Sequence, residues 1–542
     1  MKSSIKHKET VVEILKNEGA LLGSELSQII IEKLNVSATY SRQIIHRLKN
    51  NREILNTEPV RFQKNQVLYF LPGQNIKKKL REVMPDHAKT IERVYQALVE
   101  LDGFLFWSEF AKVSAGVVNQ EQSSKKSAMS IYKDMKNLGM VNELYDFHGL
   151  PVVIANKNWI PDVEVNAFSL MKREQQLSFT RKFTADLLQW LERLNFVGWN
   201  STRLTGDDEF EKGYNGFYWD AIGYSYLWGL YRTNKKDGLY NPAEEKAGSL
   251  VVIESIIHRK TKRHDINGFI NRVDNIYGPV KKDKYFKIIP VCFVDSIEDD
   301  ALILARKRGI LVIRLVEVFG TKIVESLKQL RDIDPRNIDA EMLAKILKNA
   351  DDSGQDGKFG TLKGYVFNFL VAYIFSQFQF TPKVGVKYHD PDLITRKCEC
   401  DIIAPVDDKW MIVCEVKGYS TGNEVMLGET ENDSDSVKKF FEKTCDIASK
   451  STRRDIIPLF ITSSSFSSEA IEYMEKRISK KLKSKLKSMN FPSKVFYDRN
   501  DLMDLFGNDS KYTELKKILK EFFKEQKQIT KPEKHLNGQR VI

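Results

Sequence analysis

The stretch CECDIIAPVDDKWMIVCEVKGYS, residues 398–420, decides the fold of the last third of the chain. Two apolar runs flank the polar turn VDDK, which predicts two antiparallel strands joined as a hairpin. Because the hairpin returns the end of the second strand to the start of the first, we expect Asp401 to approach Glu415 and Lys417. Side chains alternate between the faces of a strand, so Glu415 and Lys417 share a face while Val416 points into the core.

Two carboxylates that converge with an ammonium in an apolar sheet need further compensation for their charge. A divalent cation held by Asp401 and Glu415 supplies it, and hard oxygen ligands suit Mg²⁺. Such an ion lowers the pKa of a bound water and stabilises charge on phosphorus. Lys417 is then placed to orient or activate the water, or to offset negative charge. This set favours hydrolysis of a phosphodiester bond.

The order of Asp401, thirteen further residues and Glu415-Val416-Lys417 resembles the core motif of the PD-(D/E)xK nuclease superfamily. That superfamily includes restriction endonucleases, Mrr-like enzymes, Holliday-junction resolvases and transposon end-cleaving nucleases. The resemblance covers roughly residues 355–505. It implies a restriction-endonuclease-like domain, with a central mixed sheet flanked by helices, that uses Mg²⁺ or Mn²⁺.

One feature departs from the superfamily pattern. Many members carry a Glu on the helix before the Asp strand, but the corresponding helix here, GTLKGYVFNFLVAYIFSQF, contains no acid. Asp356, just before that helix, or Glu399, on the same strand face as Asp401, are alternatives. Asp392, in the dipeptide Pro391-Asp392, is a further candidate for the first acid, but it lies in a polar loop. We therefore prefer Asp401, and the upstream acid stays open.

The N-terminal 75 residues read as three helices followed by a β hairpin, an order that resembles a winged helix-turn-helix. Residues 86–160 repeat the pattern more loosely and predict a second winged-helix-like domain. The outward face of the third helix, and lysines near the third helix of the repeat, suit phosphates and base edges of duplex DNA. A solvated helix face is the alternative interpretation. The predicted DNA-binding residues are Tyr40, Arg42, Gln43, His46, Arg47, Lys49, Lys125 and Lys126.

Residues 165–335 repeat the order of elements of the last domain. Asp220 and Glu254 stand in matching contexts, but Ile256 occupies the place of the expected lysine. His258 or Lys260 could replace that lysine, but we favour a degenerate, inactive copy kept for architecture or DNA binding. The segment HRKTKRH, residues 258–264, is either a phosphate-contacting run or a solvated loop.

These patterns predict a multidomain protein: α+β winged helices followed by two tandem α/β restriction-endonuclease-like domains. The expected boundaries are a winged helix at 1–75, its looser repeat at 86–160, the degenerate domain at 165–335, the catalytic domain at 336–525 and a flexible tail at 526–542.

Composition sets limits on the class of protein. The formal net charge of +12 over 542 residues fits a polyanion-binding protein but does not require one. The five cysteines form no CxxC pair, and Cys398-Glu399-Cys400 is a weak candidate for a soft metal. The N-terminus has no apolar signal core and no apolar run approaches membrane-spanning length, so we expect a cytoplasmic protein without a membrane partner.

The leading hypothesis is a Mg²⁺-dependent endodeoxyribonuclease in restriction or anti-phage defence, the setting being implied by the resemblance alone. A transposition or repair nuclease, an RNA-processing nuclease, and a DNA-binding regulator or scaffold with inactive nuclease domains are the alternatives. Expected partners are duplex DNA and either a second copy of the chain or a separate defence or motor subunit. No Walker-type loop is present, so we expect no ATP hydrolysis.

Overall fold

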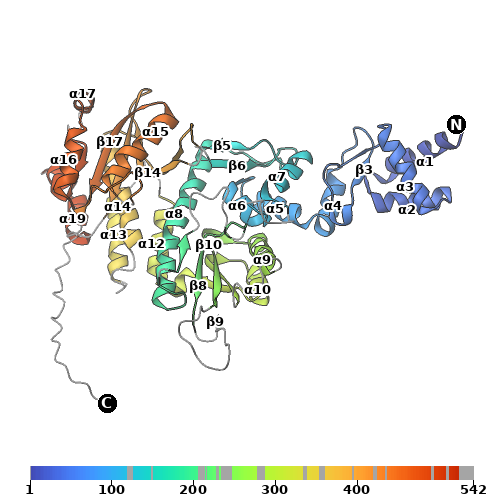
Figure 1. The fold of residues 1–542 in the computed structure, drawn as a ribbon, viewed down its shortest axis with the longest axis horizontal. Coiled ribbons are helices and arrows are strands. Elements are labelled where there is room, and N and C mark those ends of the chain that lie inside the picture. The colour runs from blue at the N-terminus through green and yellow to red at the C-terminus, as the bar shows by residue number, and fades with distance from the viewer. Residues whose placement is uncertain are drawn as a thin grey trace, which may run out of the picture. The chain divides into compact units, whose positions relative to one another are not determined.

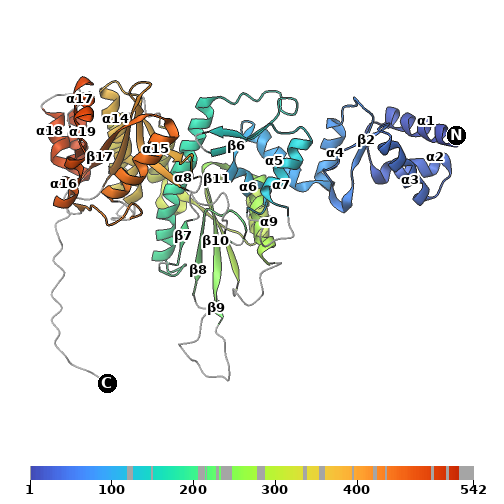
Figure 2. The ribbon, with the colours of Figure 1, turned by 45° about the horizontal axis from the view of Figure 1, so that its top comes forward.

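A computed structural model describes residues 2–118, 126–147, 150–199, 201–204, 214, 216–227, 231–232, 247–277, 287–333, 339–352, 360–393, 396–418, 424–433, 436–489, 494–507 and 512–523. The chain divides into two compact units: unit 1 holds residues 1–171 and 191–314, and unit 2 holds residues 172–190 and 315–542. Each combines helices with sheets, so the predicted mixed α/β, multidomain architecture is confirmed at this level (Figures 1 and 2).

Unit 1 begins with three helices and a small sheet of order β1-β3-β2. Apolar residues at helical spacing on α1, α2 and α3 form one core, and the Ser37 side chain caps α3 by accepting the Tyr40 N–H. The elements are α1 (Lys2–Glu18), β1 (Leu21–Leu22), α2 (Gly23–Leu34), α3 (Ala38–Asn50), β2 (Leu55–Asn56), the 3₁₀ turn η1 (Gln63–Asn65) and β3 (Leu68–Phe70).

The next segment of unit 1 has a three-stranded sheet of order β4-β6-β5. Its core is continuous with Leu22, Val60, Phe62 and Leu68 of the preceding segment, so apolar contacts join the two. The elements are α4 (Lys77–His87), α5 (Lys89–Glu100), β4 (Phe104–Phe106), α6 (Trp107–Ser114), α7 (Ala128–Asn137), β5 (Tyr145–Phe147) and β6 (Leu150–Ile154).

The largest sheet of unit 1 has the order β12-β11-β10-β8-β7, with β9 paired to β10. β10, β11 and β12 are parallel, and β8 and β7 continue the sheet in antiparallel pairs. α9 and α10 lie beside it (Figure 1). The elements are β7 (Arg203–Leu204), β8 (Ala221–Ser225), β9 (Tyr231–Arg232), β10 (Ala247–Thr261), α9 (Arg263–Tyr277), β11 (Ile288–Ile297), α10 (Asp299–Lys307) and β12 (Leu311–Arg314).

Unit 2 is built on a sheet of order β13-β14-β15-β17-β19. Its strands are β13 (Lys383–His389), β14 (Lys397–Pro405), β15 (Trp410–Lys417), β17 (Asp455–Thr462) and β19 (Phe496–Tyr497), with a separate pair β16 (Glu424–Val425) and β18 (Ser465–Phe466). The helices are α11 (Leu315–Phe319), α12 (Thr321–Arg331), α13 (Ala340–Asp352), α14 (Gly360–Gln377), the π-helix η3 (Lys439–Thr444), α15 (Cys445–Thr452), α16 (Ser468–Lys476), α17 (Lys480–Ser488), α18 (Arg499–Phe506) and α19 (Thr513–Phe522). α14 is apolar on all sides, which fits its burial against the sheet.

The long helix α8 (Ala167–Arg193) departs from the sequence-based boundaries. Its residues 172–190, together with α11 and α12, belong to unit 2, whereas the sequence analysis assigned them to the 165–335 domain. The reason is apolar contact, because Phe179 packs on Tyr365 and Phe183 packs on Phe319. Among the described residues, no helix has both the length and the apolar composition to cross a bilayer.

The two large sheets have the same strand order and the same strand directions. β8, β10, β11 and β12 correspond in order to β14, β15, β17 and β19. The register agrees as well. Pro290 pairs with Val252, which lies two residues before Glu254, and Pro458 pairs with Val413, which lies two residues before Glu415. This likeness within the chain places Asp220 and Glu254 where unit 2 has Asp401 and Glu415.

Candidate functional site

The predicted hairpin of β14 and β15 is present in unit 2. Ile402 pairs with Cys414 in the antiparallel ladder, so Asp401 and Glu415 face each other across the two strands. Asp401 Oδ2 accepts the backbone N–H of Val416 at 3.0 Å, which fixes the carboxylate beside the end of β15. Val416 itself is buried, as the alternation of side chains predicts.

Lys417 lies next to Glu415 on the same strand face. Its Nζ is 2.9 Å from Glu415 Oε1, and both side chains are largely but not fully buried. Burial raises the pKa of Glu415 to about 7; the Lys417 ammonium opposes this rise and the Asp401 carboxylate adds to it. The structure therefore brings all three predicted residues together, and Glu415 is a carboxyl group whose charge is only partly compensated.

A lysine that the sequence patterns did not predict contacts this cluster. Lys182, on the part of α8 that belongs to unit 2, lies 2.9 Å from Glu399 Oε1 and 3.5 Å from Asp401 Oδ1. Burial disfavours the Lys182 ammonium, but the two carboxylates outweigh that effect and raise its pKa. Asn368 of α14 also donates to Asp401 Oδ1, at 3.3 Å. Side chains of α8 and α14 and a backbone N–H of β15 thus contact Asp401.

Glu174 of α8 is a candidate for the open upstream acid. Its Oε1 is buried without a hydrogen-bond partner among the described residues, and burial raises its pKa to about 7. The nearby Glu399 carboxylate, one of the predicted alternatives, adds to that rise. Asp392 is exposed in the loop after β13, and Asp356 lies outside the described residues. Glu174 therefore joins Glu399 as a candidate for the acid that α14 lacks.

The carboxylates of this cluster are the groups that could hold a divalent cation. No group of three or more His, Cys, Asp or Glu side chains in the described parts of the chain is arranged to hold a metal. Asp401 and Glu415 offer two carboxylates, and Mg²⁺ usually keeps several waters and takes few protein ligands. These two carboxylates, contacted by the separate lysines Lys182 and Lys417, suit one Mg²⁺ ion that keeps most of its waters.

The corresponding position in unit 1 has a different charge balance. Asp220 accepts the backbone N–H of Ser255 at 2.7 Å, as Asp401 accepts that of Val416. Lys112 of α6 lies 2.8 Å from Asp220 and 3.2 Å from Glu254, and Arg272 lies 2.7 Å from Glu254. Lys112 contacts both carboxylates and Arg272 occupies the second oxygen of Glu254, so a metal would have to displace them.

Neither His258 nor Lys260 replaces the missing lysine of unit 1. His258 Nε2 lies 3.6 Å from Glu109 of α6, and Lys260 is exposed. The segment 258–264 is not a loop, because it forms the end of β10 and the start of α9. Arg259 in this segment forms two hydrogen bonds with the Asp265 carboxylate, so this positive charge takes part in an ion pair within the fold.

The predicted DNA-binding face of α3 is present as an exposed surface. Arg42, Gln43, His46 and Arg47 are exposed, while Tyr40 is half-buried beneath the Arg47 guanidinium. Two predicted lysines are engaged elsewhere: Lys49 pairs with Glu58, and Lys126 lies 2.6 Å from Asp134. Lys125 lies outside the described residues.

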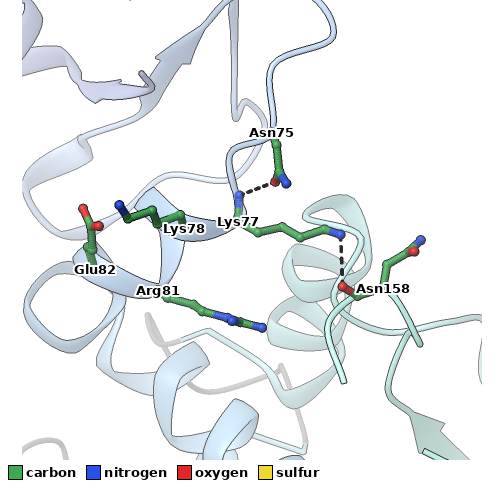
Figure 3. Close-up of a pocket in the computed structure, with 6 residues that line it drawn as sticks. All are labelled: Asn75, Lys77, Lys78, Arg81, Glu82 and Asn158. Carbon is green, nitrogen blue, oxygen red and sulfur yellow. Dashed lines mark hydrogen bonds between the residues drawn. The ribbon is translucent and has the colours of Figure 1, made fainter. Parts of the chain in front are cut away.

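A basic pocket in unit 1 was not anticipated. It has a volume of about 500 Å³ and is lined by Asn75, Lys77, Lys78, Arg81, Glu82 and Asn158. Figure 3 shows the Lys77 side chain directed at Asn158, whose carbonyl oxygen accepts its hydrogen bond at 3.0 Å. Arg81 donates to the Trp159 carbonyl oxygen and packs against the Tyr95 ring. The run KKKLR at the start of α4 was the signal for it in the sequence.

Comparison of the chain with models of known protein families, with curated proteins and with solved structures finds no match.

Proposed function

We propose that the protein is a Mg²⁺-dependent endonuclease that hydrolyses phosphodiester bonds of DNA, with Asp401, Glu415 and Lys417 as its catalytic residues. The observation that carries the proposal is the meeting of these side chains on one face of a β hairpin, with Asp401 held by the Val416 N–H. The likeness of this set to the PD-(D/E)xK motif supports it, as does the winged-helix-like order of elements in unit 1.

In this mechanism Asp401 and Glu415 would hold the divalent cation. When bound, Mg²⁺ or Mn²⁺ lowers the pKa of a water and offsets charge that develops on the phosphate. Lys417 would orient an attacking water or donate to a phosphate oxygen, since its ammonium is held 2.9 Å from Glu415. Asn368 and the Val416 N–H keep Asp401 in place, so the carboxylate does not have to reorganise during the reaction.

Delivery of duplex DNA is assigned to unit 1. The exposed polar face of α3 and the basic pocket around Lys77, Lys78 and Arg81 suit phosphate contacts. Restriction or anti-phage defence is the biological setting we propose, from the combination of domains alone. A DNA-binding scaffold is the alternative from another class, and the contact of Lys112 with both Asp220 and Glu254 favours it for unit 1 only. A transposition or repair role remains the alternative within the nuclease class.

The deciding experiment incubates the chain with supercoiled plasmid and with RNA, with Mg²⁺ or with EDTA. We expect Mg²⁺-dependent cleavage of DNA that is lost in Lys417→Ala. Lys409→Ala is the matched control, because Lys409 is an exposed lysine at the other end of the same hairpin. Inertness of wild type on every substrate would favour the scaffold, and cleavage of RNA alone would reassign the substrate.

A further inference from the structure

The carboxylates of Asp220 and Glu254 in unit 1 have all four oxygens occupied by donors. Both Asp220 oxygens accept Lys112 Nζ, at 2.9 and 2.8 Å, and Oδ2 also accepts the Ser255 N–H. Glu254 Oε1 lies 3.2 Å from Lys112 Nζ, and its Oε2 accepts Arg272 at 2.7 Å. A cation that sought these oxygens would have to displace an ammonium already bound to both residues.

The two cationic side chains are fixed in place. Arg272 is completely buried, lies over the rings of Trp219 and Phe269, and donates to the Tyr218 carbonyl oxygen. The Lys112 side chain is only 12% exposed. Burial disfavours its ammonium, yet Asp220 and Glu254 outweigh that effect and raise its pKa, so Lys112 stays charged.

Lys112 also joins two parts of unit 1. It belongs to α6, whereas Asp220 and Glu254 belong to the β8–β10 sheet. α9 packs closely on α6, because a Cβ at Gly268 would lie 2.6 Å from the Lys112 carbonyl oxygen. Ion pairs from α5 and α6, such as Glu100 with Lys262, add to the same junction.

We propose that Lys112 is a built-in cation that takes the place of a divalent metal between Asp220 and Glu254. The ion pairs of Asp220 and Glu254 with Lys112 join α6 to the sheet of unit 1, and this sheet carries no metal-dependent chemistry. Ile256, buried where unit 2 has Lys417, agrees with that loss. The proposal stands apart from the nuclease activity, since it concerns only residues of unit 1.

The test measures Mn²⁺ binding by electron paramagnetic resonance in a chain whose unit 2 carboxylates are neutralised by Asp401→Asn and Glu415→Gln. In this background, we expect no tightly bound Mn²⁺ while Lys112 is present. Lys112→Ala should create one Mn²⁺ site, and adding Glu254→Gln should abolish it. A Mn²⁺ ion bound in unit 1 with Lys112 intact, or no gain in a folded Lys112→Ala chain, would overturn the proposal.

Loss of Lys112 leaves two neighbouring buried carboxylates, so the variant could fail to fold without metal. Refolding of Lys112→Ala with and without Mn²⁺, followed by circular dichroism, keeps the test decisive. Recovery of the native spectrum only with Mn²⁺ supports the proposal, and failure under both conditions contradicts it. Lys136→Ala, which removes an exposed lysine of α7, is the control and should respond to neither condition.

Discussion

Asp401 Oδ2 accepts a hydrogen bond from the backbone N–H of Val416, the residue that follows Glu415. The same relationship joins Asp220 to Ser255, the residue that follows Glu254. In both sheets, therefore, the aspartate accepts the backbone N–H of the residue that follows the glutamate on the neighbouring antiparallel strand. The difference between them lies in the cations: Lys112 contacts both Asp220 and Glu254, whereas in unit 2 Lys182 contacts Asp401 and Lys417 contacts Glu415.

This difference gives a paired prediction for Asp401→Asn and Asp220→Asn. Asparagine keeps an oxygen that can accept the backbone N–H, so both folds should persist. Asp401→Asn should lower DNA cleavage on the order of a hundredfold or more, because loss of a charged metal ligand costs several kcal/mol of transition-state stabilisation. Asp220→Asn should leave cleavage within about twofold of wild type and lower the free energy of unfolding by about 1–3 kcal/mol, since Lys112 loses a charged partner.

Plasmid cleavage rates and urea denaturation of the same preparations measure the two effects. Equal loss of cleavage in both variants, with both folded, would mean that unit 1 takes part in the chemistry.

Lys182→Met is expected to strengthen divalent-cation binding in unit 2. Lys182 Nζ lies 3.5 Å from Asp401 Oδ1, so its charge competes electrostatically with a metal for that carboxylate. Removing one positive charge at this distance should tighten Mn²⁺ binding by about tenfold, because charges interact more strongly in a partly buried site than in water. Titration calorimetry measures the affinity, with Lys172→Met as control, because Lys172 is an exposed lysine of the same helix. Weaker binding in Lys182→Met would show that the ammonium positions Asp401.

The hairpin around Asp401 was predictable because its strands are adjacent in sequence and its alternation is local. The contacts of Lys182 and Lys112 were not, because each comes from a helix distant in sequence from its carboxylates. A signal was present in α8, where Glu174, Ser178 and Lys182 recur every four residues and therefore share one face. The charge of Lys112 in the mostly apolar helix WSEFAKVS was a comparable signal.

Because of Glu174, the free energy of unfolding in EDTA should decrease as the pH rises from about 4.5 to about 7. The pKa of Glu174 is raised by burial to about 7 from 4.5, so over this window the folded chain retains a proton that the unfolded chain has released. The contribution of Glu174 to the free energy of unfolding is therefore largest below pH 4.5, decreases as the pH rises, and becomes constant above pH 7. Glu174→Gln removes this titration. The free energy of unfolding of Glu174→Gln relative to wild type should therefore be higher at pH 7.5 than at pH 4.5, by about 1–3 kcal/mol.

Urea denaturation of wild type and Glu174→Gln across that range measures the difference between them. A difference that does not vary with pH would show that Glu174 is ionised in the fold throughout.

Gly268→Ala should destabilise unit 1. The new Cβ would lie 2.6 Å from the Lys112 carbonyl oxygen and 3.0 Å from Val113 backbone atoms, so α6 and α9 would have to separate. Overpacking of this kind costs about 1–3 kcal/mol. Gly364→Ala in α14 is the matched control, because no atom lies within 4 Å of its added Cβ and helix propensity favours alanine. Thermal unfolding of both variants decides the point, and a Tm for Gly268→Ala at or above wild type would show that the α6–α9 junction is loose.

Arg42→Gln combined with Arg47→Gln should weaken DNA binding without changing the metal site. Both guanidinium groups are exposed on α3 in unit 1, whereas Asp401 and Glu415 belong to unit 2. Each lost phosphate contact should lower the slope of log affinity against log salt concentration by about 1. Fluorescence anisotropy with duplex DNA in EDTA measures affinity and slope, and Mn²⁺ titration checks the metal site. The control is Lys16→Gln combined with Lys33→Gln, which makes an equal charge change on α1 and α2. If this pair weakened DNA binding equally, the binding would depend on net charge and not on the α3 face.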